Sequence, residues 1–410
     1  MRKILALLLV SFALLACRGE EAREVADSAA EKTESAIARA QARLAGARPD
    51  GRMTAEEITA ARRDARWRQL PSFADQRRRA AAAAQIPEVP IRFATGTTTR
   101  ETLQGVNWNA VDQLPVTVPM TTDMEGPSVL KAQVLLDRAG FSPGVVDGQW
   151  GKNTEIAVHW IQSEAGMEPT GQIDQQTYRL IASKSQSAPA VTRYSVTAED
   201  VKGPIVPIPD DVYEQADLDC LCYESAAELL AEKFHTTEET LALMNPGVEL
   251  SAIAAGTQLT VPNTAVAPRS MSVDKIVVSV EGNYLHALDS SGRIVLHAPT
   301  TVGSEYDPSP SEELKIVGIA FDPTFHYQPK LFHEVPDEEP EAMLQPGPNS
   351  PVGVVWMALS KENFGIHGTS DPSSIGYASS HGCIRLANWI ARPLAEAASQ
   401  GTVVDFVDAR

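Results

Sequence analysis

Two histidines and one cysteine lie close together near the end of the 410-residue chain, and glycine follows each histidine. His367 precedes Gly368, and His381 precedes Gly382 and Cys383. A nucleophilic cysteine needs a base, since a free thiol has a pKa of about 8.5, and it needs N–H donors for the oxyanion. Histidine supplies the base, and glycine permits the tight backbone that directs consecutive N–H groups at one point. The cluster therefore predicts acyl transfer through a cysteine acyl-enzyme.

A structural zinc site is the alternative for the same residues, with Cys383, His381 and His367 as ligands. Their spacing differs from that of zinc fingers and knuckles, so the sequence favours catalysis. His326 and His333 are candidates for lining the substrate groove. The other histidines are predicted to have structural or surface roles: His159, His235, His286 and His297.

The residues around the cluster carry a longer pattern. Positions 380–385 read Ser-His-Gly-Cys-Ile-Arg, and an Ile-His-Gly-Thr stretch precedes them at 366–369. This pattern closely resembles the signature of the YkuD-type L,D-transpeptidases, and the match extends upstream through 346–353. The resemblance covers about 272 to 408. It implies a mainly-β catalytic domain, which we place at residues 270–410.

The resemblance also implies roles for the site residues. Cys383 attacks the carbonyl between the third residue of a donor stem peptide, usually a diamino acid, and its terminal D-alanine. His367 accepts the thiol proton, and its other ring nitrogen is oriented by a backbone carbonyl, which we expect to be that of Gly368. N–H groups around Gly382 and Cys383 form the oxyanion hole. No metal or other cofactor is implied.

Four further residues are assigned from the same pattern. His381 and Ser380 support the cysteine loop. Arg385 and Thr369 are candidates for substrate binding, because a guanidinium can hold a carboxylate through two hydrogen bonds. Arg385 replaces the Asn of other members, so the role of that Asn does not carry over. Upstream, 308–313 departs from the usual Thr-Pro-x-Gly turn, and we expect that end of the groove to differ.

The acceptor of the acyl group decides the reaction. An amine of a second stem peptide gives a 3-3 cross-link, with a role in cell wall biogenesis and cell shape. Water makes the same fold an L,D-carboxypeptidase or hydrolase, and a protein amine attaches or releases a lipoprotein at peptidoglycan. An inactive domain would leave a non-catalytic wall anchor, which the intact histidine and cysteine set disfavours. The sequence favours the transpeptidase.

A loop dense in turn residues, Gly140–Gly151, follows the pattern G-x-x-P-G-x-x-D-G-x-x-G. We call it the signature loop. Apolar spacing predicts a helix at 129–139, a second begins at Asn153 or Thr154 and ends at Gln162, and a third begins near Gln175. Together these features resemble the peptidoglycan-binding domain 1 family. The resemblance implies a small all-α module at 126–183 that binds peptidoglycan.

Residues 184–212 are rich in Ser, Ala and Pro and are predicted to be a linker. Residues 213–263 then contain two helix patterns, at 224–234 and 236–245, and a turn followed by a strand at 256–263. This resembles the second half of a LysM module, a small α+β fold that recognises N-acetylglucosamine polymers. The opening strand of a LysM is not evident; Asp219-Cys220-Leu221-Cys222 stands near its place.

From about residue 270 the pattern becomes β. Short apolar runs separated by turn residues predict strands at 276–280, 284–288, 294–298, 314–320, 352–359, 365–367 and 402–407. One helix is predicted at 387–399. The whole chain is therefore expected to be multidomain.

The N-terminus predicts export. Met1-Arg2-Lys3 is basic, Ile4–Leu15 is an apolar run too short to span a bilayer, and Cys17 follows Ala16. This resembles a bacterial lipobox, with a signal peptide at 1–16 and lipidation at Cys17. Acyl chains on Cys17 would anchor the protein to a membrane. Arg18 suggests, by resemblance to Gram-negative lipoproteins, the outer membrane facing the periplasm.

Residues 17–125 are predicted to be a spacer, because the Ala/Arg/Glu-rich part lacks a sustained apolar stripe. The formal net charge of −18 argues against nucleic acid as a partner, since phosphate binding needs a basic surface. Peptidoglycan is the expected partner. Cys220 and Cys222 can form a disulfide in an oxidising compartment, which would leave Cys383 for chemistry.

Overall fold

The computed structural model describes residues 53–69, 90–94, 101–186, 188–264, 271–332 and 335–408. The predicted signal peptide at 1–16 and the lipidation of Cys17 lie outside the described residues. The described residues from 53 to 332 and from 336 to 408 belong to one compact unit. Within the described part of the chain, none of the helices combines the length and apolar character needed to cross a membrane.

Three helices form the predicted all-α module: α5 (Pro127–Arg138), α6 (Lys152–Glu164) and α7 (Gln175–Lys184). Pro127 begins α5, where its missing N–H costs no hydrogen bond. Asp174 caps α7 by accepting the Thr177 N–H at 2.7 Å. The predicted helices are confirmed. The side chain of Gln133 on α5 holds the signature loop, since its Oε1 accepts the N–H groups of Asp147 (3.1 Å) and Gly148 (2.7 Å).

Part of the segment 17–125, predicted to be a spacer, is folded. It contains the α-helix α3 (Ala55–Arg62) and the 3-10 helices η1 (Arg66–Gln69) and η3 (Trp108–Gln113). Trp67 is 5% exposed and packs into the core of the helical module, and Trp108 is 2% exposed. The segment has no apolar stripe of its own because single large aromatic side chains anchor it to a neighbouring core.

The predicted linker at 184–212 also contains structure. Strand β1 (Val191–Ser195) pairs antiparallel with β2 (Gln258–Pro262). Between them lie α9 (Ala226–Lys233) and α10 (Glu238–Met244), both of which were predicted, and the short α8 (Val212–Ala216). We call β1, α9, α10 and β2 the βααβ module. The boundary predicted at 213 was wrong, because β1 finds its partner more than sixty residues later and no local pattern reveals that pairing.

The catalytic domain is built on an eight-stranded sheet with the order β11-β10-β9-β6-β12-β3-β4-β5. Its strands are β3 (Lys275–Ser279), β4 (Tyr284–Leu288), β5 (Ile294–Pro299), β6 (Leu314–Phe321), β9 (Val355–Leu359), β10 (Gly365–His367), β11 (Ile384–Arg385) and β12 (Val403–Val407). Helix α11 (Asn388–Ala397) contributes Ile390, Ala391 and Leu394 to the core that the sheet shares. The mainly-β prediction is confirmed. Two parallel pairs, β3–β12 and β10–β11, interrupt the antiparallel pattern.

A second, two-stranded sheet was not predicted. Strand β7 (Phe325–Tyr327) pairs with β8 (Ala342–Leu344), and η5 (Pro329–Leu331) follows β7. Strands of three residues are too short to show an alternating pattern. The remaining short turns are η4 (Leu250–Ala252) and η6 (Pro372–Ser374).

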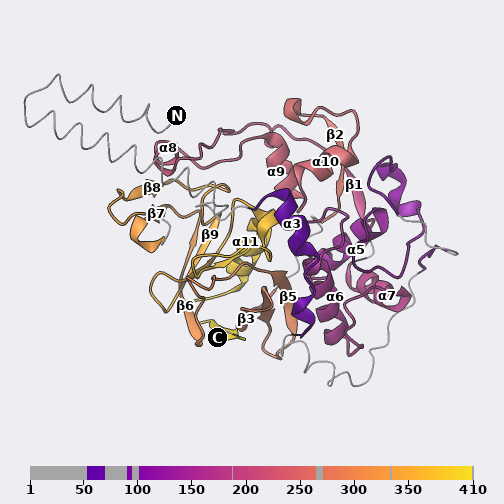
Figure 1. The fold of residues 1–410 in the computed structure, drawn as a ribbon. Helices are drawn as coiled ribbons and strands as arrows, with labels where there is room; N and C mark the ends of the chain where they lie inside the picture. The colour runs from indigo at the N-terminus through magenta and orange to yellow at the C-terminus, as the bar shows by residue number, and fades with distance from the viewer. Residues whose placement is uncertain are drawn as a thin grey trace, which may run out of the picture. The chain divides into compact units, whose positions relative to one another are not determined.

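The helical module covers the edge of the large sheet at β5. The Ser142 N–H donates to the His297 carbonyl at 2.9 Å, and the His297 N–H donates to the Gly140 carbonyl at 2.8 Å. The signature loop therefore supplies backbone partners to a strand edge that would otherwise be unpaired. Figure 1 shows β5 beside α6, in agreement with the contacts between these elements.

Candidate active site

Cys383 and His367 come from adjacent strands. Cys383 directly precedes β11, which runs parallel to β10 with His367 opposite Arg385. Side chains alternate along a strand, and residues opposite each other in a ladder share a face of the sheet. The register therefore places the side chains of Cys383, Arg385 and His367 on one face, although Cys383 and His367 are sixteen positions apart in sequence.

His367 is buried and held in one orientation. Its Nδ1 donates to the Gly368 carbonyl at 2.7 Å, the contact that the sequence predicts. The ring stacks on Trp356 with centroids 5.4 Å apart. Burial and, to a smaller extent, the Arg385 charge lower the pKa of His367 to about 3, although the hydrogen bond to the Gly368 carbonyl opposes the shift. A neutral ring with Nδ1 protonated leaves Nε2 as the basic nitrogen.

Cys383 is the free cysteine of the described residues and is partly exposed. Its Sγ lies 3.5 Å from the Asn363 carbonyl, to which the thiol can donate. Burial raises the pKa of Cys383, while the Gly365 backbone and the Arg385 charge lower it. The balance favours the thiol, so the nucleophile needs a base to remove its proton.

The turn before Cys383, residues 379–383, is fixed by two serines. The Ser380 Oγ donates to the Cys383 carbonyl at 2.5 Å. The Ser309 Oγ donates to the Gly382 carbonyl at 2.9 Å and accepts the Gly303 N–H at 2.8 Å. Gly382 has a φ of 98°, and a Cβ there would lie 2.8 Å from the Phe364 ring. These contacts hold the backbone whose N–H groups at 382 and 383 are the predicted oxyanion donors.

The other predicted residues lie at the same end of the sheet. His381 makes an edge contact with Phe332, with ring centroids 4.9 Å apart. The Arg385 carbonyl accepts from the Thr300 Oγ1 at 2.7 Å, and the Arg385 N–H donates to the Thr301 carbonyl at 2.9 Å. Thr369 is 6% exposed, and its Oγ1 accepts the Asp371 N–H at 3.1 Å. Substrate binding by Arg385 and Thr369 stays a prediction.

Sequence reasoning missed two side chains at this site. Trp356 in β9 lies opposite His367 and stacks on that ring. The alternation of Val355, Met357 and Leu359 as buried residues is the signal that puts Trp356 on the other face. Ser309 lies in the segment where the family turn is blurred, and no pattern marked it.

Two histidines proposed for the groove have different outcomes. His333 lies outside the described residues. His326 in β7 is exposed and pairs with Glu341 at 2.7 Å on its own two-stranded sheet. Among the described residues, no three His, Cys, Asp or Glu side chains are grouped so that they could hold a metal ion.

Cys220 and Cys222 form a disulfide, and the loop that it closes docks on the catalytic domain. The Leu221 N–H donates to the Pro346 carbonyl at 3.0 Å, and the Asn349 N–H donates to the Leu221 carbonyl at 2.9 Å. Leu221 is 0% exposed. The segment 346–349 thus joins the catalytic strands to the βααβ module.

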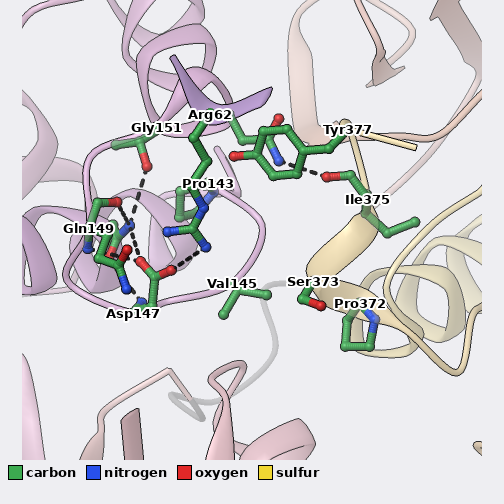
Figure 2. A pocket seen from close by; sticks show the side chains of 13 residues that line it. Arg62, Pro143, Val145, Asp147, Gln149, Gly151, Pro372, Ser373, Ile375 and Tyr377 are labelled. Carbon is green, nitrogen blue, oxygen red and sulfur yellow. Dashed lines mark hydrogen bonds and ion pairs between the residues drawn. The ribbon is translucent and has the colours of Figure 1, made fainter. Parts of the chain in front are cut away.

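A pocket lies where the signature loop meets residues 372–377 of the catalytic domain (Figure 2). Arg62 of α3 reaches Asp147 of this loop and forms an ion pair of 2.5 Å, with both side chains largely buried. The Asn153 Nδ2 donates to the Ile375 carbonyl at 2.8 Å. Asn153 or Thr154 was predicted to open α6, but the helix begins at Lys152. Asn153 lies in its first turn and connects it to the segment that leads to the cysteine loop.

The Cys383–His367 pair on adjacent strands of a mainly-β domain, joined to a helical module, defines a cysteine acyltransferase with an accessory domain. The family model for the L,D-transpeptidase catalytic domain, YkuD, matches residues 274–406. The model PG_binding_1, a peptidoglycan-binding domain, matches residues 125–181.

Individual proteins are also similar to parts of this chain. The YkuD protein of Bacillus licheniformis is 33% identical over 179 residues, which are 44% of this chain and 92% of that protein. The YbiS protein of Escherichia coli is 26% identical over 186 residues, 44% of this chain and 60% of that protein. A crystal structure of the L,D-transpeptidase from Xylanimonas cellulosilytica has 16% identity and a TM-score of 0.32, covering 72% of this chain and 99% of that one. The chain belongs to the YkuD family of L,D-transpeptidases.

Proposed function

We propose that the protein is an L,D-transpeptidase that forms 3-3 cross-links in peptidoglycan by a cysteine acyl-enzyme mechanism. The observation that carries this proposal is the pairing of β10 with β11. It brings Cys383, a partly exposed residue, to the same sheet face as His367, whose ring is fixed through the Gly368 carbonyl. Membership of the YkuD family supplies the substrate class.

The reaction follows from these groups. The Nε2 of neutral His367 takes the Cys383 thiol proton as the sulfur attacks the carbonyl that precedes the terminal D-alanine of a tetrapeptide stem. N–H groups at Gly382 and Cys383 stabilise the oxyanion. Collapse of the tetrahedral intermediate breaks the peptide bond, and the proton on His367 passes to the departing D-alanine amine. The amine of a second stem then attacks the thioester and releases Cys383.

The accessory domains place this chemistry on the wall. The helical module supports binding to peptidoglycan. We propose in addition that the βααβ module is LysM-like and binds glycan, because its order of strand, two helices and antiparallel strand is compact and complete in the structure. Export, lipidation at Cys17 and a periplasmic location at the outer membrane are proposed from the N-terminal sequence.

One experiment tests the reaction. The purified protein and its Cys383→Ala variant are incubated with disaccharide-tetrapeptide, and the products are read by mass spectrometry. A dimer that lacks one D-alanine and needs Cys383 supports the transpeptidase. A tripeptide alone that needs Cys383 would assign hydrolysis instead. No product from either protein would contradict the proposal.

A further inference from the structure

Asn388 uses all of its hydrogen-bonding positions although the reaction described above does not involve it. It is the first residue of α11 and is 3% exposed. Its Oδ1 accepts the N–H groups of Thr369 and Val354, both at 3.2 Å. Its Nδ2 donates to the Glu232 Oε2 at 3.0 Å and to the Pro348 carbonyl at 3.2 Å. Two donors meet Oδ1 and two acceptors meet Nδ2, so the partners determine the orientation of the amide.

One of these contacts reaches the catalytic histidine through a single peptide group. The Thr369 N–H that Asn388 binds belongs to the same peptide as the Gly368 carbonyl that accepts from His367 Nδ1. A peptide group is planar, so fixing the direction of its N–H also fixes the direction of its C=O. Asn388 therefore sets the direction of the carbonyl that orients the imidazole.

The backbone around the amide is shaped for this contact. A Cβ at Gly368 or at Gly353 would lie 2.1 Å from the Asn388 Oδ1. Only glycine at these two positions allows the oxygen to approach both N–H groups. Gly368 therefore contributes to the site in two ways: its carbonyl accepts from His367, and its lack of a side chain leaves room for Asn388 Oδ1.

The other end of the amide belongs to a different module. Glu232 lies on α9 of the βααβ module, which contacts α11. Its second carboxylate oxygen accepts from the Tyr223 hydroxyl at 2.8 Å. The Tyr223 hydroxyl therefore fixes the Glu232 carboxylate within the βααβ module, and the other carboxylate oxygen accepts from Asn388 Nδ2.

We propose that Glu232 and Asn388 are positioning residues, which form a relay that holds the Gly368–Thr369 peptide and through it His367. Correct placement of the catalytic base then depends on the docking of the βααβ module against α11. The effect of this relay on turnover rests on the proposed function, but its effect on the reactivity of Cys383 does not.

The test uses the full chain with Asn388→Asp, Glu232→Gln and the double variant. Asn388→Asp keeps the oxygen that accepts from Thr369 and Val354, but it places a second carboxylate opposite Glu232. Adding Glu232→Gln provides an amide that can donate to that carboxylate and restores the hydrogen bond with its direction reversed. Glu232→Ala removes the relay without altering the catalytic domain, and Glu239→Ala removes an exposed acid of the same module as a control.

Two measurements are made. Alkylation of Cys383 by iodoacetamide is followed against pH by peptide mass spectrometry, which needs no cell-wall substrate. Steady-state turnover of disaccharide-tetrapeptide gives kcat and KM. We expect Asn388→Asp and Glu232→Ala to lower kcat by about tenfold or more with little change in KM, because a base displaced by a fraction of an ångström loses its geometry. Both variants should also slow alkylation at neutral pH.

The double variant decides between positioning and general damage to the fold. The relay predicts that it recovers most of the kcat and of the alkylation rate lost in Asn388→Asp, whereas Glu239→Ala matches wild type throughout. Wild-type behaviour of Asn388→Asp and Glu232→Ala, or a double variant no better than Asn388→Asp, would overturn the relay. Altered alkylation in a protein that forms no cross-linked dimer would leave the relay standing and contradict the proposed function.

Discussion

The resting state of the catalytic pair is set at the scale of single residues. Burial lowers the pKa of His367 to about 3 and raises the pKa of Cys383, so both groups are neutral at rest. The proton moves only when substrate is attacked. Arg385 lowers the pKa of both groups, which stabilises a thiolate and disfavours an imidazolium.

This state predicts the pH dependence of the enzyme. Because the pKa of His367 lies near 3, the base stays neutral as the pH falls from 8 to 5. We expect kcat/KM for disaccharide-tetrapeptide to vary little over that interval. A steep acid limb with its midpoint near 6.5, the ordinary value for histidine, would contradict the buried neutral base.

Ser309 gives a second prediction at this scale. Ser309→Ala removes the hydroxyl that joins the Gly303 N–H to the Gly382 carbonyl. We expect kcat to fall by about tenfold, because the turn that carries the oxyanion donors loosens. Ser379→Ala, an exposed serine of the same turn, is the matched control and should retain wild-type kcat. Equal rates for Ser309→Ala and wild type would show that the turn holds without this bond.

Several of these residues were within reach of the sequence and others were not. The patterns at 366–369 and 380–385 located Cys383, His367 and Gly368 because the chemistry depends on two short segments that are close in sequence. Ser309 is 73 positions before Gly382, and Glu232 lies in another module. Such partners become neighbours only through the pairing of distant strands and the docking of helices, which local sequence does not encode.

At the scale of elements, the sequence predicted the long and amphipathic helices and strands and missed the short ones. Helices α5, α6 and α9 and strands β3 to β6 were predicted because each repeats its apolar pattern several times. Strands β7, β8 and β11 have two or three residues, too few for a pattern. Strand β1 was predicted to be part of a linker because residues 184–212 are rich in Ser, Ala and Pro, and its pairing with β2 becomes visible only in the structure.

The docking of the disulfide loop can be tested at one glycine. A Cβ at Gly347 would lie 2.0 Å from the Leu221 carbonyl. We expect Gly347→Ala to break the bonds of Leu221 with 346–349, to destabilise the fold by about 1–3 kcal/mol, and to speed amide exchange at Leu221. The control is Gly256→Ala, also at positive φ (90°) but with open space around it. If both variants exchange equally at Leu221, backbone strain rather than the contact explains the effect.

At the scale of the whole molecule, buried histidines join the helical module to the catalytic sheet. His286 Nε2 and His297 Nδ1 lie 3.1 Å apart, and the Trp160 ring of α6 packs on His286 with centroids 4.4 Å apart. Burial lowers the pKa of His286 well below its ordinary value, and burial together with the His159 charge lowers the pKa of His297 to about 3. The interface is therefore built from neutral imidazoles.

Stability should consequently depend on pH. The unfolded chain binds a proton at each histidine below about pH 6.5, whereas the folded chain does so at His297 only near pH 3, so stability is lost as the pH falls between these values. Each such histidine lowers the free energy of unfolding at pH 5 by about 2 kcal/mol. Urea unfolding at pH 7.5 and pH 5 should show a smaller loss for His297→Gln than for wild type. An equal loss in both proteins would exclude His297 as a contributor.

The backbone bonds between the signature loop and β5 bear on how the enzyme can be divided. Removing the helical module would leave the catalytic domain with a bare strand edge of six residues, Ile294–Pro299, able to pair with the same edge of a second copy. In the intact chain the helical module would prevent this self-association by covering the edge. A catalytic domain produced alone should therefore form dimers or larger aggregates as its concentration rises. The intact chain should not associate through this edge.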